Sequence, residues 1–156
     1  MSVIKVLFIC HGNICRSPMA EYMLKDLVGK RGIADKFYIA SAATSTEEIW
    51  GGKGNPVYPP AKKKLKEKGI DCSGKCAVQL TKADYERYDY LLCMDEANVR
   101  NSIRITGGDP ENKIRLLLSF TKRGGSIADP WYTGNFDDTY DDILEGITAF
   151  LKYLGY

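Results

Sequence analysis

Four short apolar runs along the chain predict β-strands. The first run, residues 3–9, is interrupted only by Lys5 and is rich in Val and Ile. A run of this kind is typical of a strand that is covered on both faces. Shorter runs at residues 37–41, 89–94 and 113–118 predict further strands of the same sheet.

Between these runs, apolar residues recur at helical spacing. Ser17 and Pro18 are typical of a helix start, and Gly29 and Gly32 are expected to end that helix. A lysine-rich helix is predicted over residues 61–68. A last helix is predicted by apolar side chains three and four residues apart, at Tyr140, Ile143, Leu144, Ile147, Leu151 and Leu154.

Strands that alternate with helices favour an α/β fold, in which a parallel sheet carries helices on both faces. We therefore expect a central four-stranded parallel sheet with helices on both of its faces. The chain has 156 residues, of which 44% are apolar, and this suits one core and a single domain over residues 1–156.

Charge and cysteine content narrow the class of protein. The net charge of +2, from 22 basic and 20 acidic residues, gives no reason to expect a nucleic-acid partner. No apolar run approaches the roughly 20 residues that span a bilayer, and no signal-peptide pattern is present, so no membrane insertion is expected. Five cysteines, an odd number, favour a reducing, cytoplasmic location. Because these cysteines do not form the close pairs of a zinc site, no metal is expected.

The end of the first predicted strand runs into a segment that suits phosphate. It reads CHGNICRSP over residues 10–18, a cysteine followed by five residues, arginine and serine. Ligands of parallel sheets bind beyond the carboxyl ends of the strands, and a helix N-terminus offers unpaired N–H groups. We therefore predict a phosphate-binding loop after the first strand, formed by His11, Gly12, Asn13, Ile14, Cys15, Arg16 and Ser17.

The side chains of this segment have distinct chemical uses. Arg16 carries a planar fork of donors that can hold two phosphate oxygens. Gly12 lets the backbone curl inward without a Cβ, and Asn13 tolerates a left-handed backbone. Cys10 lies at the focus of this positive cradle, which favours the nucleophilic thiolate. The hydroxyl of Ser17 can donate to that thiolate and ease its later departure.

Cys15 has two interpretations. It can be a thiol that only packs within the loop, or a redox partner of Cys10. In the second case it would trap an oxidised Cys10 as a disulfide before irreversible oxidation.

A second segment with chemical potential stands before the last predicted helix. It consists of Asp129, Pro130, Trp131 and Tyr132. A phenolate is a poor leaving group, because its conjugate acid has a pKa of about 10, so a positioned acid helps to expel it. Asp129 could supply that proton from a loop over the sheet edge. Trp131 and Tyr132 could line the entrance against an aromatic substrate.

Together the two segments resemble the low-molecular-weight protein tyrosine phosphatases. The resemblance covers essentially the whole chain and includes SAA at residues 41–43, LT at 80–81 and YDYLLCMDEANVR at 88–100. It implies hydrolysis of phosphotyrosine in a protein partner through a phosphocysteine at Cys10, without metal or other cofactor. It also implies that Arg16 binds the phosphate oxygens, and that Asp129 acts first as general acid and then as base.

The sequence departs from that family in three places. His11 stands where the family usually has a small or apolar residue. Many members carry His and Arg in the stretch over residues 74–79, where this chain reads GKCAVQ with Lys75, Cys76 and Val78. The sequence therefore does not indicate which side chains support Asn13. The loop that follows the second strand is longer than usual, and either Glu47 or Trp50 aligns with the aromatic residue that lines the family's pocket.

Three other functions fit parts of the pattern. An arsenate reductase on the same fold needs further cysteines, but the residue seven positions after Cys93 is Arg100. Arginine phosphatases favour Thr after the nucleophile, where this chain has His11. A module that only binds phosphopeptides should lack Cys10 or Asp129, and both are present. Each observation favours the tyrosine phosphatase.

Overall fold

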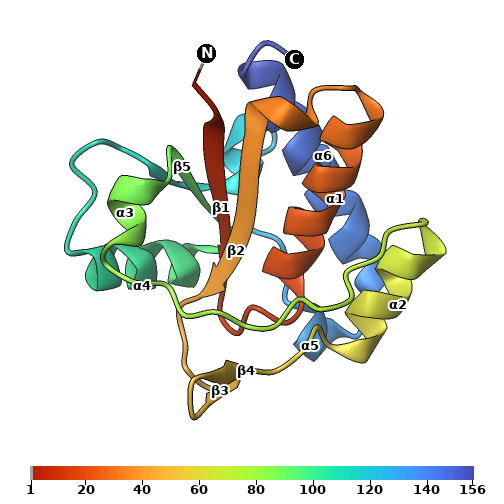
Figure 1. Ribbon diagram of the computed structural model, residues 1–156, viewed down its shortest axis with the longest axis horizontal. Coiled ribbons are helices and arrows are strands. Elements are labelled where there is room, and N and C mark those ends of the chain that lie inside the picture. The colour runs from red at the N-terminus through yellow and green to blue at the C-terminus, as the bar shows by residue number, and fades with distance from the viewer. Residues whose placement is uncertain (1) are drawn as a thin grey trace.

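The computed structural model describes residues 2–156 and is built on a four-stranded sheet with the strand order β2-β1-β5-β6 (Figure 1). All three neighbouring pairs are parallel. The strands are β1 (Ile4–Cys10), β2 (Phe37–Ala43), β5 (Tyr90–Cys93) and β6 (Ile114–Leu116). The predicted α/β fold with a four-stranded parallel sheet is therefore confirmed, and each strand lies within two residues of its predicted bounds.

Helices cover both faces of this sheet, as predicted (Figure 1). Helices α1 (Arg16–Lys30), α2 (Pro59–Glu67) and α6 (Phe136–Tyr153) lie on one side. The other side is covered by α3 (Asp84–Arg87) and α4 (Glu96–Thr106). Helix α1 begins one residue earlier than Ser17, and α2 begins at Pro59 because two consecutive prolines suit the first turn of a helix.

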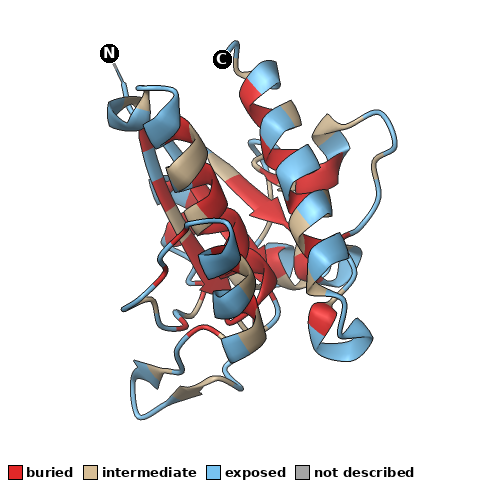
Figure 2. Cartoon of the chain, turned by 90° about the vertical axis from the view of Figure 1, so that its right-hand side faces the viewer, coloured by how far each residue is buried: buried red, intermediate tan, exposed pale blue. Residues whose placement is uncertain are grey.

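The central strand β1 explains why its sequence is continuously apolar. Val6 and Phe8 pack with α1 and α6 in one core cluster, whereas Leu7 and Ile9 pack with residues around α3 and α4 in another. Successive side chains of a strand point to opposite faces, and here both faces are buried. Figure 2 shows the buried residues gathered on the strands and on the inward sides of the helices.

Helix α4 is the largest element that the apolar pattern did not reveal. Asp95 accepts a hydrogen bond from the backbone N–H of Asn98 at 2.9 Å, and Oδ1 of Asn98 accepts one from the backbone N–H of Asp95 at 3.1 Å. The two residues therefore form a capping box. Gly107 ends the helix with a left-handed φ of 84°. Both signals are visible in the sequence, and they would have predicted this helix where the apolar spacing did not.

The remaining elements are short. A hairpin of β3 (Ile49–Trp50) and β4 (Lys53–Gly54) lies in the loop after β2, and the turn α5 (Pro130–Thr133) lies in the loop before α6. Two 3₁₀ turns, η1 and η2, span Ala34–Lys36 and Leu117–Phe120. Within residues 2–156, no helix is both long and apolar enough to cross a membrane.

The fold brings distant segments together at the carboxyl edge of the sheet. Strand β1 ends at Cys10, and α1 begins at Arg16 beside it. The backbone N–H of Ile127 donates to the carbonyl of Met94, just after β5, at 2.8 Å. This bond ties the loop before α5 to the same edge, and it places Asp129 close to the end of β1.

Candidate active site

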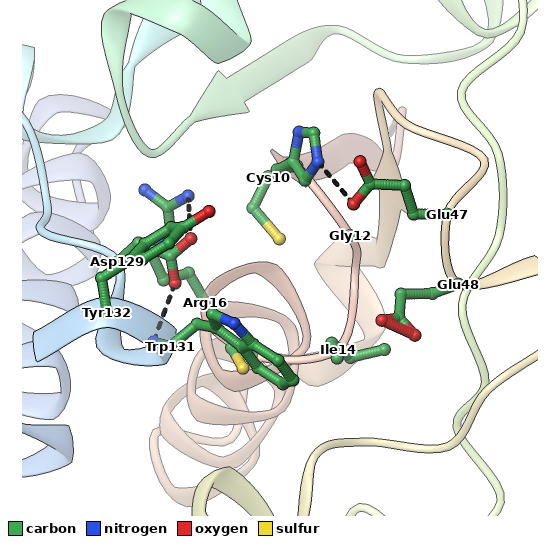
Figure 3. Close-up of a pocket in the computed structure, with 11 residues that line it drawn as sticks. Cys10, Gly12, Ile14, Arg16, Glu47, Glu48, Asp129, Trp131 and Tyr132 are labelled. Atoms are coloured by element: carbon green, nitrogen blue, oxygen red, sulfur yellow. Dashed lines mark hydrogen bonds and ion pairs between the residues drawn. The ribbon is translucent and has the colours of Figure 1, made fainter. Parts of the chain in front are cut away.

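A pocket of about 140 Å³ opens at this edge of the sheet. Figure 3 shows its lining side chains facing a common space from three segments: the loop after β1, the loop after β2, and α5 with the residue that precedes it. The lining residues are Cys10, His11, Gly12, Ile14, Cys15, Arg16, Glu47, Glu48, Asp129, Trp131 and Tyr132. All of them except Glu47 and Glu48 belong to the predicted site. The other predicted residues, Asn13 and Ser17, are buried beneath the loop at 1% and 0% exposure.

The sulfur of Cys10 receives polar contacts at the base of the pocket. Its Sγ lies 3.0 Å from the hydroxyl oxygen of Ser17. The backbone N–H of Asn13 donates to the same sulfur at 3.3 Å, and Asn13 adopts the expected left-handed backbone with φ of 58°. Gly12 was expected to avoid crowding by a Cβ, and an added Cβ would lie only 3.3 Å from Cγ of Glu48. Its lack of a side chain therefore spares the facing wall of the pocket.

Arg16 is buried and clamped beside this sulfur. Its Nη1 donates to Oδ2 of Asp95 at 2.7 Å and to the carbonyl of Ile127 at 2.9 Å. Its Nη2 lies 3.5 Å from Oδ2 of Asp129. Burial alone lowers the pKa of Arg16, but the negative Cys10 and the two carboxylates outweigh burial, so the pKa is raised. The guanidinium is therefore a permanent positive charge held in one orientation.

Asp129 caps the short helix α5. Its Oδ1 accepts a hydrogen bond from the N–H of Trp131 at 3.0 Å, and Pro130 occupies the first helical position. This capping holds the carboxyl group at the pocket, across from Cys10 in Figure 3. Trp131 is half exposed and stacks on Tyr58 with ring centroids 4.7 Å apart, which supports one wall. Tyr132 is 84% exposed and stands at the mouth.

The opposite wall carries two carboxylates. His11 projects to the mouth, and its Nε2 lies 3.0 Å from Oε2 of Glu47. Glu48 accepts a hydrogen bond from Nδ2 of Asn55 at 2.8 Å. Trp50 is 76% exposed in the hairpin and is absent from the pocket lining. Of the two alternatives for the lining position, Glu47 is therefore the one that faces the pocket.

Cys15 is a buried thiol in the pocket wall. Burial raises its pKa far above the ordinary value, and the negative charges of Cys10 and Asp129 raise it further, while Arg16 lowers it. Cys15 is therefore a neutral thiol near pH 7. All five cysteines lie within the described residues and are free. Over residues 2–156 no cluster of three or more His, Cys, Asp or Glu side chains could hold a metal ion.

Three residues of the site were missed at the sequence level. Asp95 directly follows the predicted strand 89–94, and a carboxylate at the carboxyl end of a strand was a usable signal. Tyr58 supports Trp131 through ring stacking, which no local pattern indicates. Glu48 reaches the pocket only because the loop after β2 folds back over Gly12.

The chain is similar to known proteins over nearly its full length. A family model described as low molecular weight phosphotyrosine protein phosphatase matches residues 5–155. The low molecular weight protein-tyrosine-phosphatase YfkJ of Bacillus subtilis is 34% identical over 151 residues, which are 96% of this chain and 94% of YfkJ. The human low molecular weight phosphotyrosine protein phosphatase is 39% identical over 152 residues, with coverages of 94% and 93%.

Two solved structures extend the comparison. The crystal structure of YfkJ matches with a TM-score of 0.89 at 34% identity, and covers 99% of this chain and 96% of that chain. The crystal structure of DARP, a Drosophila arginine phosphatase, matches with a TM-score of 0.86 at 30% identity, over 98% of this chain and 99% of that chain.

Proposed function

Because the chain belongs to the low molecular weight phosphotyrosine protein phosphatases and is a protein-tyrosine phosphatase, we propose that it hydrolyses phosphotyrosine through a covalent phosphocysteine. The nucleophile is Cys10, the phosphate clamp is Arg16, and the acid and base is Asp129. Neither a metal nor an organic cofactor takes part, because Arg16 and the backbone N–H groups of the loop supply the positive field.

In the first step the thiolate sulfur of Cys10 attacks the phosphorus atom. The bond between phosphorus and the phenolic oxygen breaks, and its electron pair stays on that oxygen. A protonated Asp129 gives its proton to this oxygen, so neutral tyrosine leaves. Arg16 holds two of the equatorial phosphate oxygens with the N–H groups that Asp95 and Ile127 leave free.

In the second step a water molecule attacks the phosphorus atom of the phosphocysteine. Asp129, now a carboxylate, takes a proton from this water. The bond between phosphorus and sulfur breaks, and sulfur leaves as a thiolate that accepts a hydrogen bond from Ser17. The net reaction consumes one water and releases tyrosine and inorganic phosphate.

One observation carries this proposal. The Cys10 sulfur, with Ser17 Oγ at 3.0 Å and the N–H of Asn13 at 3.3 Å, lies in one pocket with Arg16 and Asp129. A thiolate there has donors on its side and a carboxyl group opposite, which are the groups that both steps require.

The test is a trapping experiment with Cys10→Ser as the partner variant. Acid quench of the wild type during turnover of phosphotyrosine peptide should give a protein one phosphoryl group heavier, with the added mass on Cys10. Cys10→Ser should still bind inorganic phosphate but should lose nearly all turnover. Wild-type rates in Cys10→Ser would overturn the assignment of the nucleophile.

Phosphoarginine is a second candidate substrate. The pocket mouth carries Glu47 and Glu48, whose oxygens can accept hydrogen bonds from a guanidinium, and a structural relative is an arginine phosphatase. Trp131 and Tyr132 favour an aromatic ring instead. Matched peptides with phosphotyrosine, phosphoserine or phosphoarginine should give the highest kcat/KM for phosphotyrosine. A higher value for phosphoarginine would reverse the preference.

The proposal also covers the partner and the location of the enzyme. Its partner is a phosphotyrosine-containing protein, it binds no nucleic acid, and it acts as a single domain over residues 1–156. The free cysteines support a reducing compartment such as the cytoplasm, where a catalytic thiolate persists.

A further inference from the structure

A buried chain of hydrogen bonds leads away from Cys10 beneath the phosphate-binding loop. Ser17 Oγ lies 3.0 Å from the Cys10 sulfur, and Nδ2 of Asn13 donates to that Oγ at 2.7 Å. The same Nδ2 donates to Oγ of Ser41 at 2.9 Å. Ser41 in turn donates to Oε1 of Glu21 at 2.5 Å. The chain therefore connects the sulfur to a buried carboxylate on α1.

The partners fix the direction of every bond in this chain. The backbone N–H of Val78 donates to Oδ1 of Asn13 at 3.0 Å, so the Asn13 amide must turn its two N–H groups toward the serines. Ser41 has one proton and gives it to Glu21, so it can only accept from Asn13. Ser17 also accepts from Asn13, and its single proton is left for the sulfur of Cys10.

Lys75 lies at the far end of the chain. Its side chain is 10% exposed, and its Nζ lies 3.6 Å from Oε1 of Glu21, the oxygen that accepts from Ser41. It also donates to the carbonyl of Ser41 at 3.2 Å. A second cation, Lys25, contacts the other oxygen, Oε2, at 2.6 Å, and this side chain is 42% exposed. Lys75 is thus the buried counterion of the oxygen that directs the chain.

We infer that Lys75 is a positioning residue for Cys10, acting through Glu21, Ser41, Asn13 and Ser17. Its positive charge beside Oε1 of Glu21 holds that oxygen as the acceptor of the Ser41 proton, and this leaves the Ser17 proton pointed at the sulfur. Without Lys75 the buried Oε1 loses its buried cation, which disfavours the present arrangement of the bonds around it. The Ser41 hydroxyl is then free to turn its proton toward Asn13, and the amide loses the orientation that leaves the Ser17 proton for Cys10.

The pKa of Lys75 fits this arrangement. Burial lowers it, and Glu21 opposes that effect both through its charge and through its hydrogen bond. Burial has the larger effect, so the pKa of Lys75 lies below its ordinary value, and Glu21 is the group that favours the charged form of the lysine in this buried place. This inference rests on the proposed role of Cys10 as the nucleophile.

The test compares Lys75→Met with Lys25→Met, which removes the more exposed cation of the same carboxylate. The rate of Cys10 alkylation by iodoacetate is measured against pH in each protein. In Lys75→Met the midpoint should move up by about one pH unit, a roughly tenfold loss of thiolate on its acid side. Lys25→Met should leave the midpoint nearly in place. Lys75→Arg keeps the positive charge, so its midpoint should lie close to that of the wild type.

Kinetics separate positioning from simple damage to the fold. In Lys75→Met, kcat should fall about fivefold to tenfold, because Ser17 stabilises the departing thiolate, while KM should stay within about twofold. Ser41→Ala breaks the same chain without leaving a lone buried charge, and it should shift the midpoint in the same direction. The double variant Lys75→Met/Ser41→Ala should add little to Ser41→Ala alone.

Three results would overturn the inference: an unchanged midpoint in Lys75→Met, an equal shift in Lys25→Met, or fully additive effects in the double variant. Cys10→Ser keeps the two proposals apart. If Cys10→Ser is inactive and Lys75→Met behaves like wild type, only the positioning role fails. If Cys10→Ser turns over phosphotyrosine normally, the proposed function itself fails.

Discussion

The floor and the mouth of the pocket are built in opposite ways. The floor comes from one continuous segment, and its residues Asn13, Arg16 and Ser17 are at most 2% exposed. The mouth joins two loops that lie about eighty residues apart in the sequence, and it includes the exposed side chains of Glu47 and Tyr132. Buried hydrogen bonds and charges are expensive to disrupt, whereas exposed charges are screened by water and salt. Changes in the floor should therefore alter the chemistry, and changes in the mouth should alter substrate preference.

Asp129 lies at the boundary of the two regions, and its loss should have the largest effect. Asp129→Ala should lower the single-turnover rate on phosphotyrosine peptide by about 10²–10⁴-fold, the usual contribution of a general acid. A substrate with an acidic leaving group, such as p-nitrophenyl phosphate, needs less protonation and should lose much less. Rapid-quench measurement of the first product separates this step from hydrolysis of the phosphoenzyme.

Asp141→Ala is the matched control, because Asp141 is an exposed carboxylate on α6 outside the pocket. It should keep wild-type rates on both substrates. Equal losses on both substrates in Asp129→Ala would show that Asp129 positions Arg16 instead of donating a proton, since its Oδ2 lies 3.5 Å from Nη2 of that residue.

The same contrast explains which parts of the molecule the sequence reveals. Strand β1 and the loop from Cys10 to Ser17 are local, so apolar spacing, a cysteine and an arginine at fixed separation predict both. Ser41 and Val78 are distant in sequence from Asn13. Ser41 meets it only after β1 and β2 pair in register, and Val78 only after its carbonyl accepts the N–H of Ala43 at the end of β2. The support of Asn13 could not be read from spacing, because tertiary structure alone brings these residues together.

Other misses have different causes. Helix α4 was overlooked because Val99, Ile103 and Ile105 are its only large apolar residues, although the capping pair of Asp95 and Asn98 was visible in the sequence. Glu47 and Trp50 could not be separated by alignment of motifs, since a loop of changed length can place either residue at the pocket. The hairpin of β3 and β4 decides between them by carrying Trp50 away.

Within the pocket wall, Cys15 should protect Cys10 from lasting oxidation, and this protection should depend on pH. Peroxide converts the Cys10 thiolate to a sulfenic acid and releases hydroxide, and attack by the Cys15 thiolate on the Cys10 sulfur then expels a second hydroxide and forms a disulfide. Burial raises the pKa of Cys15, so its thiolate is scarce at neutral pH and increases as pH rises toward that pKa. The fraction of activity that dithiothreitol recovers should therefore rise severalfold between pH 6.5 and 8.5.

Two cysteine variants test this protection. Cys15→Ser should keep most activity before peroxide and recover little afterwards at either pH. Cys76→Ser removes an exposed thiol and should recover like wild type. Recovery that is independent of both pH and Cys15, or the absence of a Cys10–Cys15 crosslink in mass spectra of the inactivated protein, would contradict the role of Cys15.

The smallest expected effects belong to the carboxylates of the mouth. Exposed charge pairs contribute little to binding, so peptides with Lys or Arg beside phosphotyrosine should exceed matched peptides with Glu by about twofold to fivefold in kcat/KM. Glu48→Gln should remove more of this preference than Glu47→Gln, because Glu47 already faces His11 at 3.0 Å. Glu48 faces only a neutral amide, that of Asn55, at 2.8 Å.

His11→Leu then provides the sharpest test of this difference. It removes the partner of Glu47 and should raise the preference for basic peptides, and Glu47→Gln in that background should cancel the gain. The preference should fade as salt rises from low to high concentration, and p-nitrophenyl phosphate, which has no flanking residues, should be hydrolysed equally by all the variants. If Glu48→Gln leaves the peptide preference intact at low salt, the mouth selects by shape and not by charge. The floor would then still perform the chemistry, but the proposal that the mouth selects substrates by charge would be wrong.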